Sequence, residues 1–178
     1  MWFKSPKRQQ KLAVLMVCMG NICRSPIAEA VLGAKLARAG LASVVAVDSA
    51  GTHGFHRGAP ADPRAVARAG LRGYQLAELK SRPLLAADFS RFDLLLAMDR
   101  DNLAALRDRC APAEQHRLGL LLLHAAQSES GGNATASRDE VPDPYYGSAA
   151  GFDLALDLIE PACEGLLSTL QRRLAEAS

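Results

Sequence analysis

The sequence predicts an α/β fold: a three-layer, doubly wound sheet of four parallel strands with helices on both faces. Two observations predict it. Apolar runs of strand length alternate with segments of helical periodicity along the chain, as in parallel sheets built from strand–helix–strand units. The first run, LAVLMVC at 12–18, is apolar throughout, which is typical of a strand buried on both faces. A turn and a helix follow it, so a binding loop is expected at its carboxyl end.

The four predicted strands lie at 12–18, 43–51, 93–99 and 117–125. Each is a short apolar run bounded by turn or polar residues. A helical segment follows or precedes each of them, so the strands are expected to pair in parallel, because consecutive parallel strands need such crossovers.

Capping residues set the limits of the first two predicted helices. Ser25-Pro26 opens the first helix, since proline suits the first helical turn, and Gly40 is a natural stop. Asp62-Pro63 repeats the pattern of a cap followed by proline, and that helix runs to about Leu71.

The second half of the chain predicts three further helices. A short helix falls within 85–92, and a clear one covers 100–110, with Asp99 or Asp101 near its cap. A long amphipathic helix covers about 150–176, where Pro161 should kink it or begin a second piece. The Ser- and Gly-rich segment before it, within 126–140, is predicted to be a flexible surface loop.

Length and composition indicate one globular domain. The chain has 178 residues, of which 22% are charged, and a net charge of +2. We expect a single domain over 12–178 preceded by a flexible N-terminal extension, 1–11. The absence of a basic stripe argues against a nucleic-acid partner. The apolar runs are too short to cross a bilayer, and the N-terminal sequence does not predict a signal peptide. We therefore expect no membrane insertion.

The chain has four cysteines, at 18, 23, 110 and 163. So few cysteines, two of them isolated, do not predict a disulfide framework in a chain of this length. A reducing cytoplasm is the expected location. The four histidines do not pair with the cysteines at zinc-like spacings, so neither a metal nor another cofactor is predicted.

Cys18 begins the sequence CMGNICRS, a C-x5-R-S pattern between the first strand and the first helix. The thiolate is the reacting form of cysteine, and a helix N-terminus, loop N–H groups and the Ser25 hydroxyl can all stabilise that anion. Gly20 and Asn21 allow unusual backbone conformations. The fork of Arg24 can bind two phosphoryl oxygens at once. A loop of this kind can also hold a phosphoryl group under attack.

Alternatives to a nucleophile remain for this cysteine on the pattern alone. Cysteine at a strand end is often only buried, and C-x5-R arises by chance in many proteins. A further alternative is that Cys18 and Cys23 form a redox pair. The strand before Cys18 and the Ser-Pro helix start after it favour the catalytic interpretation.

Hydrolysis of a phosphate monoester also needs an acid for the leaving group, and Asp143 in VPDPYYG is the candidate. It follows the fourth strand and so belongs to the same edge of the sheet as Cys18. An aspartate of a turn is the alternative. Aromatic residues form only 5% of the chain, yet Tyr145 and Tyr146 stand beside this aspartate and Phe55 follows the second strand. Such aromatics suit an aryl substrate.

Together these residues resemble the low-molecular-weight protein tyrosine phosphatases of the bacterial type. The motifs that carry the resemblance, between about Leu12 and Leu174, are CMGNICRSPIAEAV, DSAGT, DPRAV, SRPL, DFSRFD, MDRDNL, VPDPYYG and GFDLALDLIE. The resemblance implies Cys18 as the nucleophile that forms a cysteinyl-phosphate, Arg24 as the phosphate binder, and Asp143 as general acid and then base. It also implies that the remaining contacts to phosphate or substrate come from Met19, Gly20, Asn21, Ile22, Cys23, Ser25, Phe55, Tyr145 and Tyr146.

Further expectations come from the same resemblance. Asp99 and the Ser81-Arg82 pair match supporting positions, and Cys23 matches a cysteine that can form a reversible disulfide with the nucleophile. The implied substrate is a phosphotyrosine protein, and a bacterial tyrosine kinase is an implied partner. Inhibition by phosphate-like oxyanions and a monomer or weak dimer are also implied.

Other activities share this fold, so three alternatives stay open. An arginine phosphatase is disfavoured because such enzymes carry Thr where this chain has Ile22. An arsenate reductase is disfavoured because residues 71–105 contain no cysteine. A non-catalytic phosphocysteine carrier would not need Asp143. Departures from the family pattern are Phe55 in place of a frequent Trp, a longer stretch before PDPYYG, and Pro161.

Overall fold

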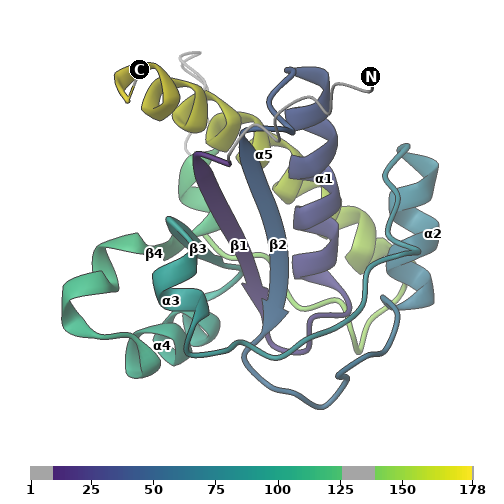
Figure 1. Cartoon of the computed structure of the whole chain (residues 1–178). Coiled ribbons are helices and arrows are strands. Elements are labelled where there is room, and N and C mark those ends of the chain that lie inside the picture. Colours follow the sequence, from purple (N-terminus) through teal and green to yellow (C-terminus); the bar gives the residue numbers. More distant parts are fainter. Residues whose placement is uncertain (1–9, 126–138, 178) are drawn as a thin grey trace, which may run out of the picture.

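A computed structural model describes residues 10–125 and 139–177. Most of the expected N-terminal extension and of the 126–140 loop therefore lies outside the described residues. The four predicted strands pair in parallel in the order β2-β1-β3-β4 (Figure 1). Their bounds are β1 Leu12–Cys18, β2 Val45–Gly51, β3 Leu94–Ala97 and β4 Leu118–Leu120. The predicted doubly wound sheet is confirmed.

The two faces of β1 show why the sheet has helices on both sides. Val14 and Met16 belong to one buried cluster, and Leu15 and Val17 belong to another. Successive side chains of a strand point to opposite faces, so an entirely apolar strand requires cover on each face. One cluster includes apolar residues of α1, Arg24–Arg38, and α5, Ala149–Glu176.

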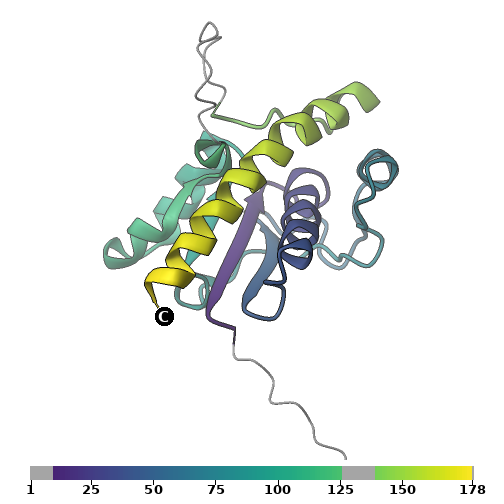
Figure 2. The ribbon, with the colours of Figure 1, turned by 90° about the horizontal axis from the view of Figure 1, so that it is seen from above.

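The second cluster contains residues of α3, Asp88–Arg91, and α4, Arg100–Arg109. α2, Pro63–Leu71, packs against α5 beside α1. α5 also packs against α1, and Figure 2, seen from above, shows α5 (yellow) running along the sheet. Two 3₁₀ helices, Pro112–Arg117 and Leu121–His124, precede and follow β4.

The extent predicted for the last strand was wrong. The run predicted as a strand over 117–125 is strand only at Leu118–Leu120 and then a 3₁₀ helix, because its remaining apolar residues pack against α5 rather than extending the sheet. α1 begins at Arg24, so Pro26 lies in its first turn, as predicted. Pro161 was predicted to kink the last helix or to begin a second piece; α5 is one continuous helix, so no second piece begins there. Buried residues lie on both sides of that proline, at Ile159 and Ala162.

The predicted caps are confirmed. The carboxylate of Asp62 accepts a hydrogen bond from the backbone N–H of Arg64 at 2.8 Å, and that of Asp99 accepts one from Asn102 at 2.7 Å. Gly40, after α1, has a φ of 70°, a conformation that favours glycine.

The carboxyl edge of the sheet gathers distant segments of the chain. β1 and β2 both end at the lower edge in Figure 1. The N–H of Val141 donates to the carbonyl of Met98 at 2.8 Å, just beyond β3, so residues 139–147 reach the same edge. Within residues 10–125 and 139–177, no helix is long and apolar enough to cross a membrane.

Candidate active site

The segment 18–25, called here the cysteine loop, connects β1 to α1 and is buried except at Met19 and Gly20. Cys18 is only 2% exposed. Its Sγ lies 3.0 Å from the Ser25 hydroxyl, and the backbone N–H of Asn21 points at the same sulfur at 3.3 Å. Both groups can donate hydrogen bonds to the sulfur in its reacting, thiolate form.

Asn21 is the centre of the network that shapes the cysteine loop. Its side-chain amide donates to the hydroxyls of Ser25 at 2.9 Å and Ser49 at 2.8 Å. Its side-chain oxygen accepts from the backbone N–H of Arg82 at 2.9 Å. The φ of Asn21 is 55°, a left-handed conformation that asparagine tolerates. The Ser49 hydroxyl in turn donates to Glu29 at 2.5 Å.

Gly20 lies close to the side chain of His56 and does not have a positive φ. Its φ is not among the positive values of this chain, which corrects the expectation of an unusual conformation. A Cβ at this position would lie 3.0 Å from the His56 ring. The Ser81 hydroxyl donates to the carbonyl of Gly20 at 3.1 Å. A Cβ on Gly51, at the end of β2, would meet the carbonyl of Met19 at 2.8 Å.

Arg24 joins the cysteine loop to the other residues of the site. Its guanidinium donates to Asp99 at 2.5 Å and to the carbonyl of Val141 at 3.1 Å. A third bond reaches Asp143 at 3.0 Å. Burial opposes the charge, but the negative charges of Cys18, Asp99 and Asp143 dominate and raise the pKa of Arg24. The side chain is therefore a fixed cation beside the sulfur.

The segment 142–147, called here the aspartate loop, carries Asp143 and is largely exposed. One carboxylate oxygen of Asp143 bonds to Arg24, and the other accepts from the backbone N–H of Tyr145 at 3.1 Å. The rings of Tyr145 and Tyr146 meet edge to face at 4.9 Å. Tyr146 is 96% exposed.

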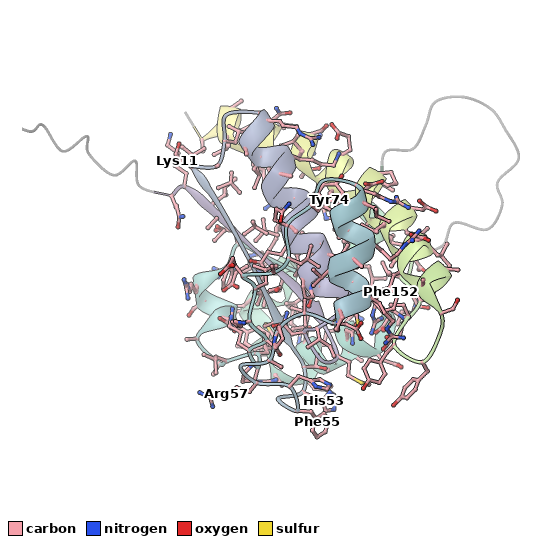
Figure 3. The ribbon with its side chains drawn as sticks, turned by 90° about the vertical axis from the view of Figure 1, so that its right-hand side faces the viewer. Lys11, His53, Phe55, Arg57, Tyr74 and Phe152 are labelled. Atoms are coloured by element: carbon pink, nitrogen blue, oxygen red, sulfur yellow. The ribbon has the colours of Figure 1, made fainter. Side chains whose placement is uncertain are left out.

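A cavity of about 280 Å³ lies between the two loops. Phe55, which is 80% exposed, forms part of its rim and stacks on His53 at 5.3 Å. Figure 3 shows these two rings at the lower edge of the molecule. The residues that line the cavity are Cys18, Met19, Gly20, Ile22, Cys23, Arg24, Phe55, His56, Asp143, Tyr145 and Tyr146.

All but two of the site residues expected from the sequence line this cavity. Asn21 and Ser25 lie behind it and support the sulfur. His56 was missed by sequence reasoning, although it follows Phe55 directly, and its ring lies 6.3 Å from that of Tyr145. Glu29 and Ser49 were also missed, because nothing in their spacing points to the cysteine loop.

Cys23 lines the cavity but differs from Cys18 in its surroundings. Burial, followed by the negative charges of Asp62, Cys18 and Asp143, raises the pKa of the Cys23 thiol to about 12. It therefore stays protonated at neutral pH. All four cysteines of the chain are free thiols. Within the described residues, no three His, Cys, Asp or Glu side chains are grouped as metal ligands.

This fold and site define a class of protein: a doubly wound α/β protein that holds a reactive cysteine and a buried arginine at the start of one helix. The cationic fork, loop amide and helix N-terminus suit a tetrahedral oxyanion. The sulfur is positioned to attack such a group, and the carboxyl group of Asp143 can exchange a proton with a departing oxygen.

Comparison with known proteins agrees with that class. The family model for "Low molecular weight phosphotyrosine protein phosphatase" matches residues 13–176. The chain is 44% identical to the low molecular weight protein-tyrosine-phosphatase of Streptomyces coelicolor, over 90% of this chain and 94% of that protein. It is 37% identical to the low molecular weight protein-tyrosine phosphatase A of Mycobacterium tuberculosis, over 92% and 94%. The chain belongs to the low molecular weight phosphotyrosine protein phosphatase family.

Solved structures give the same result. A protein tyrosine phosphatase of Entamoeba histolytica with Hepes in the active site superposes with a TM-score of 0.82 and 39% identity, covering 90% of this chain and 97% of that one. Wzb of Vibrio vulnificus in complex with benzylphosphonate superposes with a TM-score of 0.72 and 28% identity, covering 90% and 99%.

Proposed function

We propose that this protein hydrolyses phosphotyrosine in proteins through a cysteinyl-phosphate intermediate. The observation that carries the proposal is the assembly of Cys18, Arg24 and Asp143 around one cavity whose rim is aromatic. Membership of the family and the tyrosine phosphatase activity for which its relatives are named support it. Residues 12–178 would form the single phosphatase domain.

The first step is attack by the Cys18 thiolate on phosphorus. The S–P bond forms while the P–O bond to the tyrosine oxygen breaks, and protonated Asp143 gives its proton to that oxygen. Arg24 and the loop amides bind the phosphoryl oxygens as charge spreads over them. In the second step Asp143 removes a proton from water, which attacks phosphorus and releases inorganic phosphate. Ser25 and the N–H of Asn21 stabilise the departing thiolate.

The rim favours an aryl ester over the alternatives. Phe55, Tyr145 and Tyr146 can contact the ring of phosphotyrosine, and Ile22 adds an apolar wall. The remaining cysteines argue against arsenate reduction, because Cys110 and Cys163 are buried in the two hydrophobic clusters. A non-catalytic phosphocysteine carrier would need no acid for a leaving group, so the position of Asp143 beside the cavity argues against it.

We also propose a location, a partner, an oligomeric state, a class of inhibitor and a role for Cys23. The four free thiols suit a reducing cytoplasm, and a bacterial tyrosine kinase would supply the phosphorylated substrate. The chain would act as a monomer or weak dimer, and phosphate-like oxyanions would inhibit it by occupying the cysteine loop. Cys23 would protect Cys18 from over-oxidation by forming a reversible disulfide.

The test is release of inorganic phosphate from a phosphotyrosine peptide, compared with a phosphoarginine peptide and with thiol-dependent reduction of arsenate. The proposal expects kcat/KM for phosphotyrosine to exceed that for phosphoarginine by about 100-fold, with no arsenate reduction. The Cys18→Ser variant, purified in parallel, controls for contaminating phosphatases. A strong preference for phosphoarginine, or reduction of arsenate at a comparable rate, would overturn the assignment.

A further inference from the structure

Arg64, in the first turn of α2, forms hydrogen bonds in two directions. Its Nε and one terminal nitrogen donate to the carboxylate of Asp62 at 3.0 and 2.9 Å. The terminal nitrogens also donate to the backbone carbonyls of Tyr145 at 2.9 Å and Gly147 at 3.0 Å. Four of the five guanidinium N–H donors are thus used. The side chain is shared between its own helix and the aspartate loop.

The other end of this connection is the cysteine loop. The backbone N–H of Asp62 donates to the carbonyl of Ile22 at 2.7 Å. The carboxylate of Asp62 also caps α2, and its hydrogen bonds from Arg64 lower its pKa, so it remains an anion. A continuous path of hydrogen bonds therefore runs from the carbonyl of Ile22, through Asp62 and Arg64, to the aspartate loop.

The aspartate loop has few other attachments. Within residues 10–125 and 139–177, hydrogen bonds join 142–147 to other elements through two side chains, Arg24 and Arg64. Arg24 binds the carboxylate of Asp143 itself, whereas Arg64 binds the backbone. The peptide N–H that orients Asp143 belongs to Tyr145, the residue whose carbonyl Arg64 holds. Arg64 therefore fixes the segment that aims the carboxylate.

Aromatic rings fix the plane of the guanidinium. Its central carbon lies 4.8 Å from the centre of the Phe152 ring and 5.9 Å from that of Tyr145. Phe152 is buried where α2 and α5 meet, as Figure 3 shows. Lysine could not replace this arrangement, because a point charge cannot form two pairs of directed bonds and stack on a ring.

We propose that Arg64 is a positioning residue that holds Asp143 at the angle required for proton transfer to the leaving group. This role rests on the proposed phosphatase function. It acts through the backbone of Tyr145 and Gly147, so it should affect only the step that needs the acid. Capture of the phosphoryl group by Cys18 and Arg24 does not depend on it.

The test compares kcat/KM of Arg64→Met on two substrates. Phenyl phosphate has a poor leaving group that needs a proton, whereas 2,4-dinitrophenyl phosphate has a leaving group that departs without one. We expect a loss of about tenfold or more on the first substrate and less than about twofold on the second. Inhibition by inorganic phosphate should stay within about twofold of wild type.

Arg68→Met is the matched control, since Arg68 lies one turn further along α2 and pairs with Asp153 of α5 at 2.6 Å, away from the aspartate loop. It should keep the wild-type ratio of the two substrates. In an Asp143→Asn background, Arg64→Met should add less than about twofold, because the acid that it positions is already absent.

Equal slowing of both substrates by Arg64→Met, or a full additional loss in the Asp143→Asn background, would reject the positioning role while leaving the phosphatase function intact. If Arg64→Met does not fold, Arg64→Lys is the second variant. It should lose kcat/KM on phenyl phosphate but not on 2,4-dinitrophenyl phosphate. Wild-type kcat/KM of Arg64→Lys on both substrates would overturn the proposal. Absence of turnover by the wild-type protein on either substrate would reject the proposed function, and this role with it.

Discussion

The cysteine loop and the aspartate loop face the same cavity, yet they are held in different ways. The cysteine loop is mostly buried, and partners from several elements fix it, including Ser49 of β2 and the backbone of Arg82. The aspartate loop is exposed and is tied to other elements by two arginine side chains. The first loop must hold a phosphoryl group that is the same in every substrate. The second must meet leaving groups and peptide surroundings that vary.

The largest expected effect comes from removing the nucleophile of the buried loop. Cys18→Ser should lower turnover of a phosphotyrosine peptide by about 10⁴-fold or more, because a hydroxyl without a general base is a far weaker nucleophile than a thiolate. Calorimetry should show that peptide binding is largely kept. Cys110→Ser, a change in the cluster on the other face of the sheet, should leave turnover unchanged. Substantial activity in Cys18→Ser would contradict the assignment.

The next effect tests whether the network around Asn21 gives the buried loop its rigidity. Asn21→Ala removes three hydrogen bonds and should cost about 3 kcal/mol of unfolding free energy, with a fall in kcat/KM of at least about tenfold. Chemical denaturation and steady-state kinetics measure both. Asn21→Gly keeps the left-handed conformation accessible, so it should be about 1 kcal/mol less destabilised than the alanine variant. Wild-type stability in both variants would show that the network is dispensable.

A smaller effect is expected on the exposed loop. Tyr146→Ala should change the unfolding free energy by less than about 0.5 kcal/mol, since the side chain is solvent-exposed. It should lower kcat/KM for a phosphotyrosine peptide about threefold through lost ring contact, with no change in inhibition by inorganic phosphate. Leu123→Ala, which alters an exposed residue outside the cavity, is the control. A stability loss as large as that of Asn21→Ala would erase the contrast between the loops.

The smallest effect concerns Glu29, at the far end of the network. Burial, assisted by Asp48 and opposed by Ser49 and Arg82, raises the pKa of this carboxyl. Because the folded protein holds the Glu29 proton more tightly than the unfolded chain does, the unfolding free energy falls as the pH rises above the pKa of this carboxyl in the unfolded chain. The unfolding free energy of Glu29→Gln should therefore rise relative to that of wild type as the pH increases above the unfolded glutamate pKa of about 4.3. Glu176→Gln, at the exposed end of α5, should show no such trend; a constant difference for Glu29→Gln would contradict the assigned cause.

The sequence was informative where one short pattern determines the structure. The apolar strand 12–18 and the caps at Asp62 and Asp99 predicted the order of elements, because buried strands and capping residues are local signals. The same reasoning placed Cys18, Arg24 and Asp143 at one edge of the sheet, since carboxyl ends of parallel strands share an edge.

The remainder depends on contacts between distant segments. Nothing local reveals that Ser49 and Glu29 support Asn21, or that Arg64 reaches across to Tyr145. The apolar run after Leu120 was predicted to be strand, because periodicity cannot tell a strand from another buried segment that packs on a helix. Pro161 lies in a helix whose buried residues, on both sides of it, outweigh the missing hydrogen bond.

In the proposed mechanism the cysteine loop performs the attack on phosphorus and the aspartate loop supplies the proton. The most direct test is kcat/KM of Asp143→Asn for a series of aryl phosphates with leaving groups of differing basicity. We expect kcat/KM to fall about 100-fold on phenyl phosphate and less than about fivefold on 2,4-dinitrophenyl phosphate. Equal slowing across the series would contradict it and remove Asp143 from the role of acid.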